Sequence, residues 1–136
     1  MRYSKEFVGE TLGIFLMVLF GCGSVTVSVL FGAYNRILQI AMVWGIGVTL
    51  AIYLTRHLSC VHLNPAVSVA MVIGKRMSVK KLPVYLIAQF VGATLAGVAI
   101  YVLFSPSISA YETAHNIIRG SVESVRCFLC MCSSLP

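Results

Sequence analysis

The chain has 136 residues, of which 59% are hydrophobic and only 10% are charged, and its mean hydropathy is +0.94. Such a composition is typical of an integral membrane protein and excludes an ordinary soluble domain. The net charge of +6 does not indicate nucleic acid binding, because the cations gather beside the ends of apolar stretches. We therefore expect the lipid bilayer, and no nucleic acid, as a partner of this chain.

Three long uncharged stretches begin at Thr11, Ile37 and Leu82. A helix that crosses a bilayer takes about 20 apolar residues, and each stretch approaches or exceeds that length. The first stretch is longer than the apolar region of a signal peptide, so we expect it to be retained as a helix. The sequence predicts an all-α membrane protein with spans near residues 7–31, 37–56 and 82–104.

Lysine and arginine are distributed unevenly between the two sides of these spans. Arg2 and Lys5 precede the first span and four cations in segment 75–81 precede the third, whereas Arg36 is alone in the loop at 32–36. By the positive-inside rule, the N-terminus and segment 75–81 are cytoplasmic and that loop is outside. We predict a multi-pass protein of the cell's inner (plasma) membrane, with its N-terminus in the cytoplasm and its C-terminus outside.

Asn64, Pro65 and Ala66 form the most informative motif of the chain. Asn is a favourable N-cap and Pro fits the first helical position, so the uncharged run up to Gly74 is predicted to form a helix. At 1.5 Å per residue this helix is about 15 Å long, half the thickness of the bilayer core. A helix this short is tolerated at membrane depth only where its N-terminus faces a polar cavity. We predict a re-entrant half-helix at residues 64–74 that lines a pore.

Two polar residues stand in otherwise apolar spans. Glu10 lies near the start of the first span and Gln89 near the start of the third. A carboxylate in a membrane is costly unless it is hydrogen-bonded, and the irregular backbone before Asn64 needs acceptors. We expect Glu10 to lie buried against residues 57–63 and to accept backbone hydrogen bonds there, and we expect a structural role of the same kind for Gln89.

Small residues predict close packing of two spans. Gly9 and Gly13 have the GxxxG spacing, and Ala88, Gly92 and Ala96 form one stripe along the third span. Small side chains let backbones approach each other within the bilayer. We expect both spans to pack tightly against neighbouring helices.

Trp44 lies about 10 Å into the second span from its outer end, deeper than an interfacial anchor. Two interpretations remain open for it: packing against lipid or core, and lining an outer constriction. His57 and His62 are five positions apart, which fits neither one helical face nor a zinc motif. We interpret His62 as a residue that orients its loop.

The last ten residues contain Cys127, Cys130 and Cys132. Three thiols without a scaffold are weak evidence for a metal site, so we expect no metal and no cofactor. The sequence shows no nucleophile–base pair, and we expect no enzymatic activity.

The Asn-Pro-Ala motif with His62 before it resembles the aquaporin and glycerol-facilitator family, also called the major intrinsic proteins. The resemblance is closest to bacterial glycerol uptake facilitators and covers roughly residues 6–125. Four further segments carry it: residues 7–24, 42–55 and 89–93 resemble the family's first three helices, and residues 111–125 resemble an outer loop.

The resemblance implies a pore role for seven residues. Asn64 would donate its side-chain amide to the solute at the pore centre, and the carbonyl groups of residues 60–62 would form a ladder of acceptors. Trp44 would form the apolar wall of an outer filter that receives the carbon backbone of a polyol. The implied pore residues are Trp44, Cys60, Val61, His62, Asn64, Pro65 and Ala66.

Four residues depart from the family pattern. Cys60 and Val61 replace smaller residues, which would narrow the pore or displace the loop. Ser68 stands where the family usually has Thr, and Ile14 where it has a small polar residue.

The family's channel is an inverted repeat of six spans and two half-helices, and this sequence matches one repeat. We expect residues 1–105 to form the N-terminal repeat and residues 106–125 an outer loop. The pattern breaks off near Arg126, as after a frameshift or a deliberate cut, so residues 126–136 are expected to be an unstructured, non-native tail.

Three functions follow as hypotheses. The first is a passive channel for glycerol, water and other small uncharged solutes, present as a truncated half that assembles with a second repeat or as a homo-oligomer. The second is a non-transporting remnant, and the third is a small membrane assembly subunit. An assembly subunit has no need of an Asn-Pro-Ala motif, so the sequence favours the first two.

Overall fold

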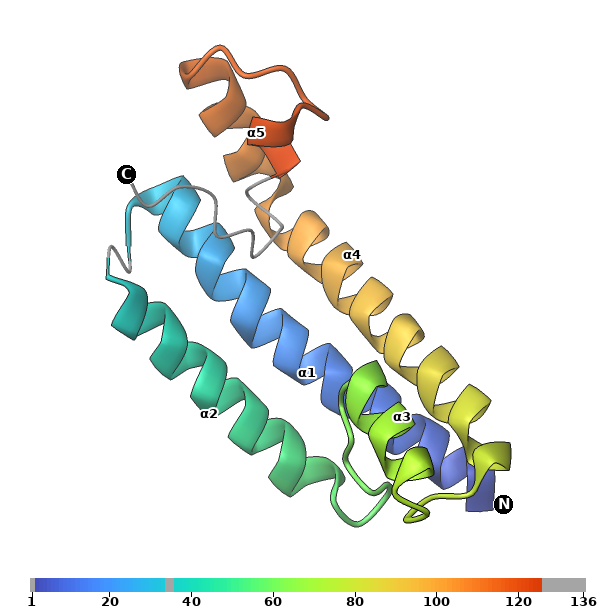
Figure 1. Ribbon diagram of the computed structural model, residues 1–136. Coiled ribbons are helices and arrows are strands. Elements are labelled where there is room, and N and C mark those ends of the chain that lie inside the picture. Colours follow the sequence, from blue (N-terminus) through green and yellow to red (C-terminus); the bar gives the residue numbers. More distant parts are fainter. Residues whose placement is uncertain (1, 34–35, 126–136) are drawn as a thin grey trace.

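The computed structural model describes residues 2–33 and 36–125 (Figure 1). In these two ranges every regular element is helical, and three helices are long and apolar enough to cross a membrane. This confirms the predicted all-α membrane fold. The elements are α1 (Arg2–Phe31), α2 (Ile37–Thr55), α3 (Pro65–Ile73), the 3₁₀ helix η1 (Val79–Lys81), α4 (Leu82–Ala114) and α5 (Val122–Val125).

Helix α1 lies between α2 and α4 and packs against both of them (Figure 1). The chain leaves α2 at the same end of the bundle where α1 begins, and its loop runs back along α1. Helix α3 then returns to that end, beside α4. With nine residues it is about 14 Å long, so it reaches only part of the way along the bundle. The predicted half-helix is confirmed, with bounds within one residue of those expected.

The contact between α1 and α4 depends on the small-residue stripe of α4. Ala88, Gly92 and Ala96 are all buried, and a Cβ atom placed on Gly92 would lie 2.4 Å from the carbonyl oxygen of Thr11. The Thr11 hydroxyl donates a hydrogen bond to the Ala88 carbonyl oxygen at 3.2 Å. The backbones of the two helices are therefore closer here than any side chain would allow.

The two glycines of the GxxxG pair in α1 lie mainly against the loop before α3, whereas their spacing predicted contact with a neighbouring helix. A Cβ atom on Gly9 would lie 2.9 Å from the Cβ atoms of Leu58 and Ser59, and one on Gly13 would lie 2.4 Å from a methyl carbon of Leu63. All three neighbours belong to the loop before α3. The glycines of α1 thus make room mainly for the irregular chain, although Gly13 also lies close to Thr55 at the end of α2.

Helix α4 continues past residue 104, the predicted end of the third span, to Ala114, with Pro106 inside it. The first part of segment 106–125, expected to be a loop, is therefore helical. The buried Glu112 accepts hydrogen bonds from Ser124 and Arg119. The hydrogen bond between Glu112 and Arg119 raises the pKa of Arg119. These contacts tie α5 back to the end of α4, a tertiary interaction that composition does not reveal. The expected tail at 126–136, with its three cysteines, lies outside the described residues.

Gly92→Ala should destabilise the helix bundle by about 1–3 kcal/mol, because its methyl group forces α4 away from the Thr11 backbone. The free energy of unfolding is measured by circular dichroism during titration with sodium dodecyl sulfate. Gly97→Ala is the matched control on the same helix, because its Cβ atom meets nothing within 4 Å. Equal stability of the two variants would contradict the proposed role of the close contact.

Candidate functional site

The N-terminus of α3 is built by Asn64, whose backbone is extended at φ −160° and ψ 129°. Its side-chain oxygen accepts a hydrogen bond from the Ala66 N–H at 2.8 Å, and Pro65 occupies the first helical turn. The Asn64 carbonyl oxygen accepts from the Ser68 N–H and hydroxyl. All three residues of the Asn-Pro-Ala motif are exposed. Because capping uses only the oxygen of the amide, the NH₂ group of Asn64 stays available as a donor.

The loop before Asn64 has an unusual backbone. Val61 and Leu63 have positive φ angles of 53° and 48°, the left-handed region that costs a non-glycine residue roughly 1–2 kcal/mol. The cost is higher for a β-branched residue such as Val61. The surrounding contacts must therefore stabilise this conformation.

Glu10 provides those contacts. One carboxylate oxygen accepts hydrogen bonds from the Ser59 hydroxyl at 2.9 Å and the His62 N–H at 3.0 Å. The other accepts from the Leu63 N–H at 3.0 Å and the Gln89 side-chain amide at 2.8 Å. The Glu10 side chain has no exposed surface. A single carboxylate of α1 thus satisfies two N–H groups of the loop backbone and joins the loop to α4.

Gln89 extends the network to α3. Its amide also donates to the Ser68 hydroxyl at 3.1 Å, and the same hydroxyl lies 3.1 Å from Nδ1 of His62. The His62 ring is buried, with its centroid 4.8 Å from that of the Tyr85 ring. His62 is therefore held from two sides, in keeping with a residue that orients its loop.

Two members of this network were missed in the sequence analysis. The fully buried Tyr85 accepts a hydrogen bond from the Cys60 N–H at 3.3 Å, and Ser59 both donates to Glu10 and accepts from the Val61 N–H. Tyr85 lies four positions before Gln89, so the two share one face of α4. That spacing was the available signal for Tyr85. Ser59 had none beyond being a hydroxyl residue in the loop.

Glu10→Ala should leave the N–H groups of His62 and Leu63 buried without an acceptor, which costs roughly 1–3 kcal/mol for each group. Hydrogen–deuterium exchange of these two amides should become much faster. The Arg56 amide, which donates to Ile52 at the end of α2, should exchange at an unchanged rate.

Glu112→Ala is the matched control for this experiment. It removes a buried carboxylate that is also hydrogen-bonded, and its hydrogen-bond partners in the described part of the chain, Arg119 and Ser124, lie away from the loop before α3. If both variants changed the loop amides alike, the specific role of Glu10 would be contradicted.

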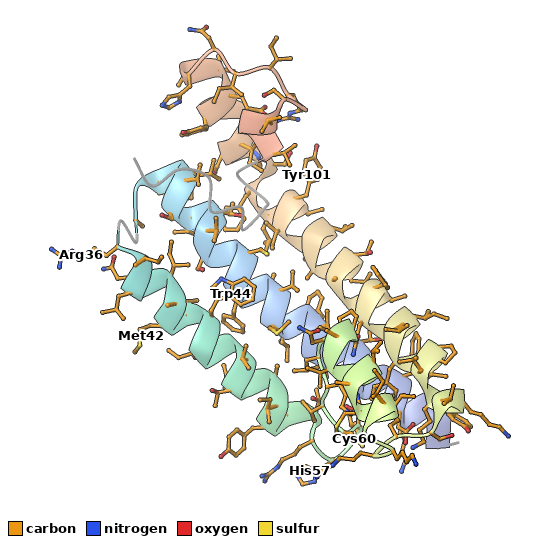
Figure 2. All side chains as sticks on the ribbon, in the orientation of Figure 1. Arg36, Met42, Trp44, His57, Cys60 and Tyr101 are labelled. Atoms are coloured by element: carbon orange, nitrogen blue, oxygen red, sulfur yellow. The ribbon has the colours of Figure 1, made fainter. Side chains whose placement is uncertain are left out.

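The other predicted pore residues differ in their exposure. Cys60 is exposed and Val61 half-buried, and within the described part of the chain no hydrogen bond ends on the carbonyl oxygens of residues 60–62. Trp44 is half-buried and packs on α1, where a Cβ atom on Gly21 would lie 2.3 Å from the indole ring. Figure 2 shows Trp44 farther along the bundle from Cys60, on α2. The structure thus joins His62 to Glu10 and Gln89 and keeps Trp44 apart from them.

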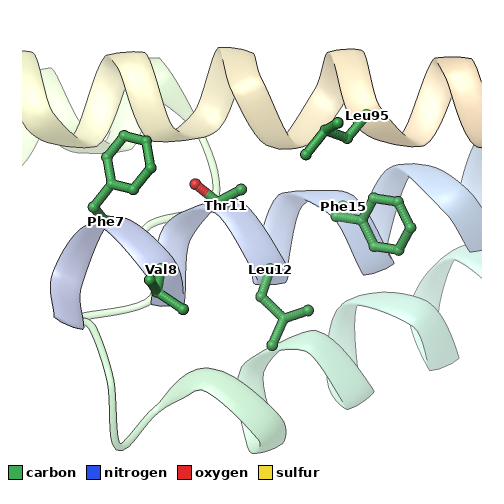
Figure 3. Close-up of a pocket in the computed structure, with 6 residues that line it drawn as sticks. All are labelled: Phe7, Val8, Thr11, Leu12, Phe15 and Leu95. Atoms are coloured by element: carbon green, nitrogen blue, oxygen red, sulfur yellow. The ribbon is translucent and has the colours of Figure 1, made fainter. Parts of the chain in front are cut away.

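Of the hollows beside α1, two bear on the interpretation of the site. A cavity of about 210 Å³ adjoins Asn64 and Pro65, and its remaining lining is mainly apolar. A groove of about 370 Å³ between α1 and α4 is lined by Phe7, Val8, Thr11, Leu12, Phe15 and Leu95 (Figure 3). The Thr11 hydroxyl is bonded to the backbone, so this groove has no polar group to orient a solute and suits lipid chains. In the described ranges no cluster of three or more potential metal ligands occurs.

Comparison with known proteins agrees with this geometry. The family described as Major intrinsic protein matches residues 1–131, and the chain therefore belongs to the major intrinsic protein family. It is 41% identical over 118 residues to the glycerol uptake facilitator protein of Pseudomonas aeruginosa, which covers 87% of this chain and 42% of that relative.

Two further relatives extend the comparison. The propanediol uptake facilitator of Salmonella typhimurium is 41% identical, over 86% of this chain and 44% of its own length. The aquaglyceroporin structure from Plasmodium falciparum superposes with a TM-score of 0.75 at 33% identity, over 79% of this chain and 45% of that one. The chain thus spans less than half the length of each of these relatives.

Proposed function

We propose that this chain forms one half of a passive membrane channel for glycerol and other small uncharged solutes. The observation that carries the proposal is the exposed N-terminus of α3. Among the described residues, neither the NH₂ group of Asn64 nor the carbonyl groups of residues 60–62 have a hydrogen-bond partner. The relatives support the solute class, because two of them are named for the uptake of glycerol or propanediol.

The chemistry of this site suits a hydroxylated solute. The NH₂ group of Asn64 and the positive end of the α3 dipole donate to a hydroxyl oxygen, and the carbonyl groups of residues 60–62 accept from hydroxyl protons. Trp44 offers an apolar wall to the carbon atoms. A solute is thus given donors, acceptors and an apolar surface without any charged group that would bind an ion.

A second repeat completes the pore in this proposal. The Asn-Pro-Ala motif is exposed, and the mainly apolar cavity beside Asn64 and Pro65 suits packing of another helix. A second copy of this chain is disfavoured as the opposing wall. Such a copy would be inverted in the membrane and would place Lys75, Arg76 and Lys80 on the outer side, against the positive-inside rule. We therefore assign the opposing wall to a different sequence, and the N-terminus of this chain to the cytoplasm.

The 136-residue chain alone, reconstituted in lipid vesicles, should take up glycerol no faster than empty vesicles in a light-scattering swelling assay. One half-helix leaves the conduit without its opposing wall. Joining the second half of the Pseudomonas aeruginosa relative after Val125 should produce rapid uptake.

The relative's second half expressed without this chain is the matched control, and it should also be inactive. Rapid glycerol uptake by the isolated chain would contradict the half-channel proposal and show that copies of this chain complete a pore by themselves.

In the joined protein, Trp44→Ala should lower the ratio of glycerol to water permeability by about tenfold, because the solute loses an apolar contact worth roughly 1–3 kcal/mol. Both permeabilities come from the same swelling assay under glycerol and sucrose gradients. Trp44→Phe keeps an aromatic wall and should stay close to the parent ratio. An unchanged ratio in the alanine variant would remove Trp44 from the filter.

A further inference from the structure

The turn between α3 and α4 has a well-defined backbone. The N–H groups of Arg76 and Met77 both donate to the Met71 carbonyl oxygen, and the Lys75 N–H donates to that of Val72. Lys75 adopts a positive φ of 55°. Because these amides are bonded back to α3, the turn holds its side chains outward in a fixed arrangement.

Three cations of this turn have no partner. Lys75, Arg76 and Lys80 are exposed, and their side chains make no hydrogen bond or ion pair among the described residues. Lys81 differs, because its ammonium group pairs with Glu6 of α1. Glu6 and Glu10 are the acidic residues that α1 brings to this end, and both are buried. Nothing described near the turn neutralises the three exposed charges.

Two large apolar side chains flank these cations. Ile73, the last residue of α3, is 77% exposed, and Val79 in η1 is 67% exposed. Both lie where the third membrane-crossing helix begins, since the apolar helical segment starts at Val79. Positive charges between exposed aliphatic side chains at the end of a span fit the boundary between lipid head groups and acyl chains.

We propose that residues 73–80, here called the basic turn, bind anionic phospholipid head groups. Lys75, Arg76 and Lys80 contact the lipid phosphates, while Ile73 and Val79 lie among the first methylene groups of the acyl chains. A nucleic acid or an acidic protein would satisfy the charges and leave the aliphatic side chains in water. The bound lipid holds the C-terminal end of α3 at the membrane surface, and this interaction is independent of solute conduction.

The test is native mass spectrometry of the detergent-solubilised 136-residue chain with phosphatidylglycerol or phosphatidylcholine of identical acyl chains. Wild type should bind phosphatidylglycerol more tightly. The triple variant Lys75→Gln, Arg76→Gln, Lys80→Gln should lose roughly 100-fold in affinity for phosphatidylglycerol, at about fivefold per charge, and keep its affinity for phosphatidylcholine. Ile73→Ser with Val79→Ser should weaken binding of both lipids.

Arg36→Gln is the matched control, because Arg36 is an exposed cation at the opposite end of the bundle (Figure 2). It should bind both lipids as wild type does. Equal affinity of wild type for the two lipids, or an unchanged triple variant, would overturn the proposal. Displacement of phosphatidylglycerol by low millimolar inorganic phosphate would also overturn it in favour of a free-phosphate site. If the triple variant loses its helical circular dichroism signal, the single variant Lys80→Gln replaces it in the test. Its affinity for phosphatidylglycerol should fall about fivefold, and an unchanged affinity would overturn the proposal.

Discussion

Backbone N–H and C=O groups at membrane depth must find partners within the protein, and the loop before α3 is where this constraint is hardest to meet. Helices satisfy it internally, whereas the N–H groups of residues 60–63 have side chains as their acceptors. Glu10 resolves the problem by offering two acceptor atoms to four donors. The Glu10 carboxylate, which is costly in a span, is thus stabilised by hydrogen bonds from the loop. The loop in turn needs this carboxylate as an acceptor for its N–H groups.

Close packing is what brings the carboxylate to its donors. Gly9 and Gly13 flank Glu10 on α1 and admit Ser59 and Leu63 of the loop at short distance, so the backbone N–H groups reach the carboxylate directly. On the other side, the contact of Gly92 with α1 places α4 so that its amide donor also reaches Glu10. The small residues therefore bring the donors of the polar network within reach of Glu10, in addition to allowing the helices to pack closely.

The two ends of α3 are held by different contacts and, in our proposal, serve different purposes. At its N-terminus the loop is held so that Asn64 uses its oxygen for the helix cap and leaves its NH₂ group available as a donor, which in our proposal binds the solute. The carbonyl groups of residues 60–62 accept no hydrogen bond from the described residues, whereas the N–H groups of this segment are bound from the side of Glu10 and Tyr85. At its C-terminus the basic turn connects α3 to the membrane boundary. The half-helix is thus positioned by the protein at one end and, in our proposal, by lipid at the other.

The sequence by itself determined the three spans and the half-helix, because apolar length and the N-cap at Asn64 are local properties. It also predicted that Glu10 meets the loop, since any irregular segment in a membrane needs acceptors. Only the tertiary structure decided which donors Glu10 accepts, that Val61 and Leu63 adopt left-handed backbone, and that α4 continues to Ala114. These features depend on how close two helices and a loop approach, and that distance is set by residues far apart in the chain whose combined packing no local pattern encodes.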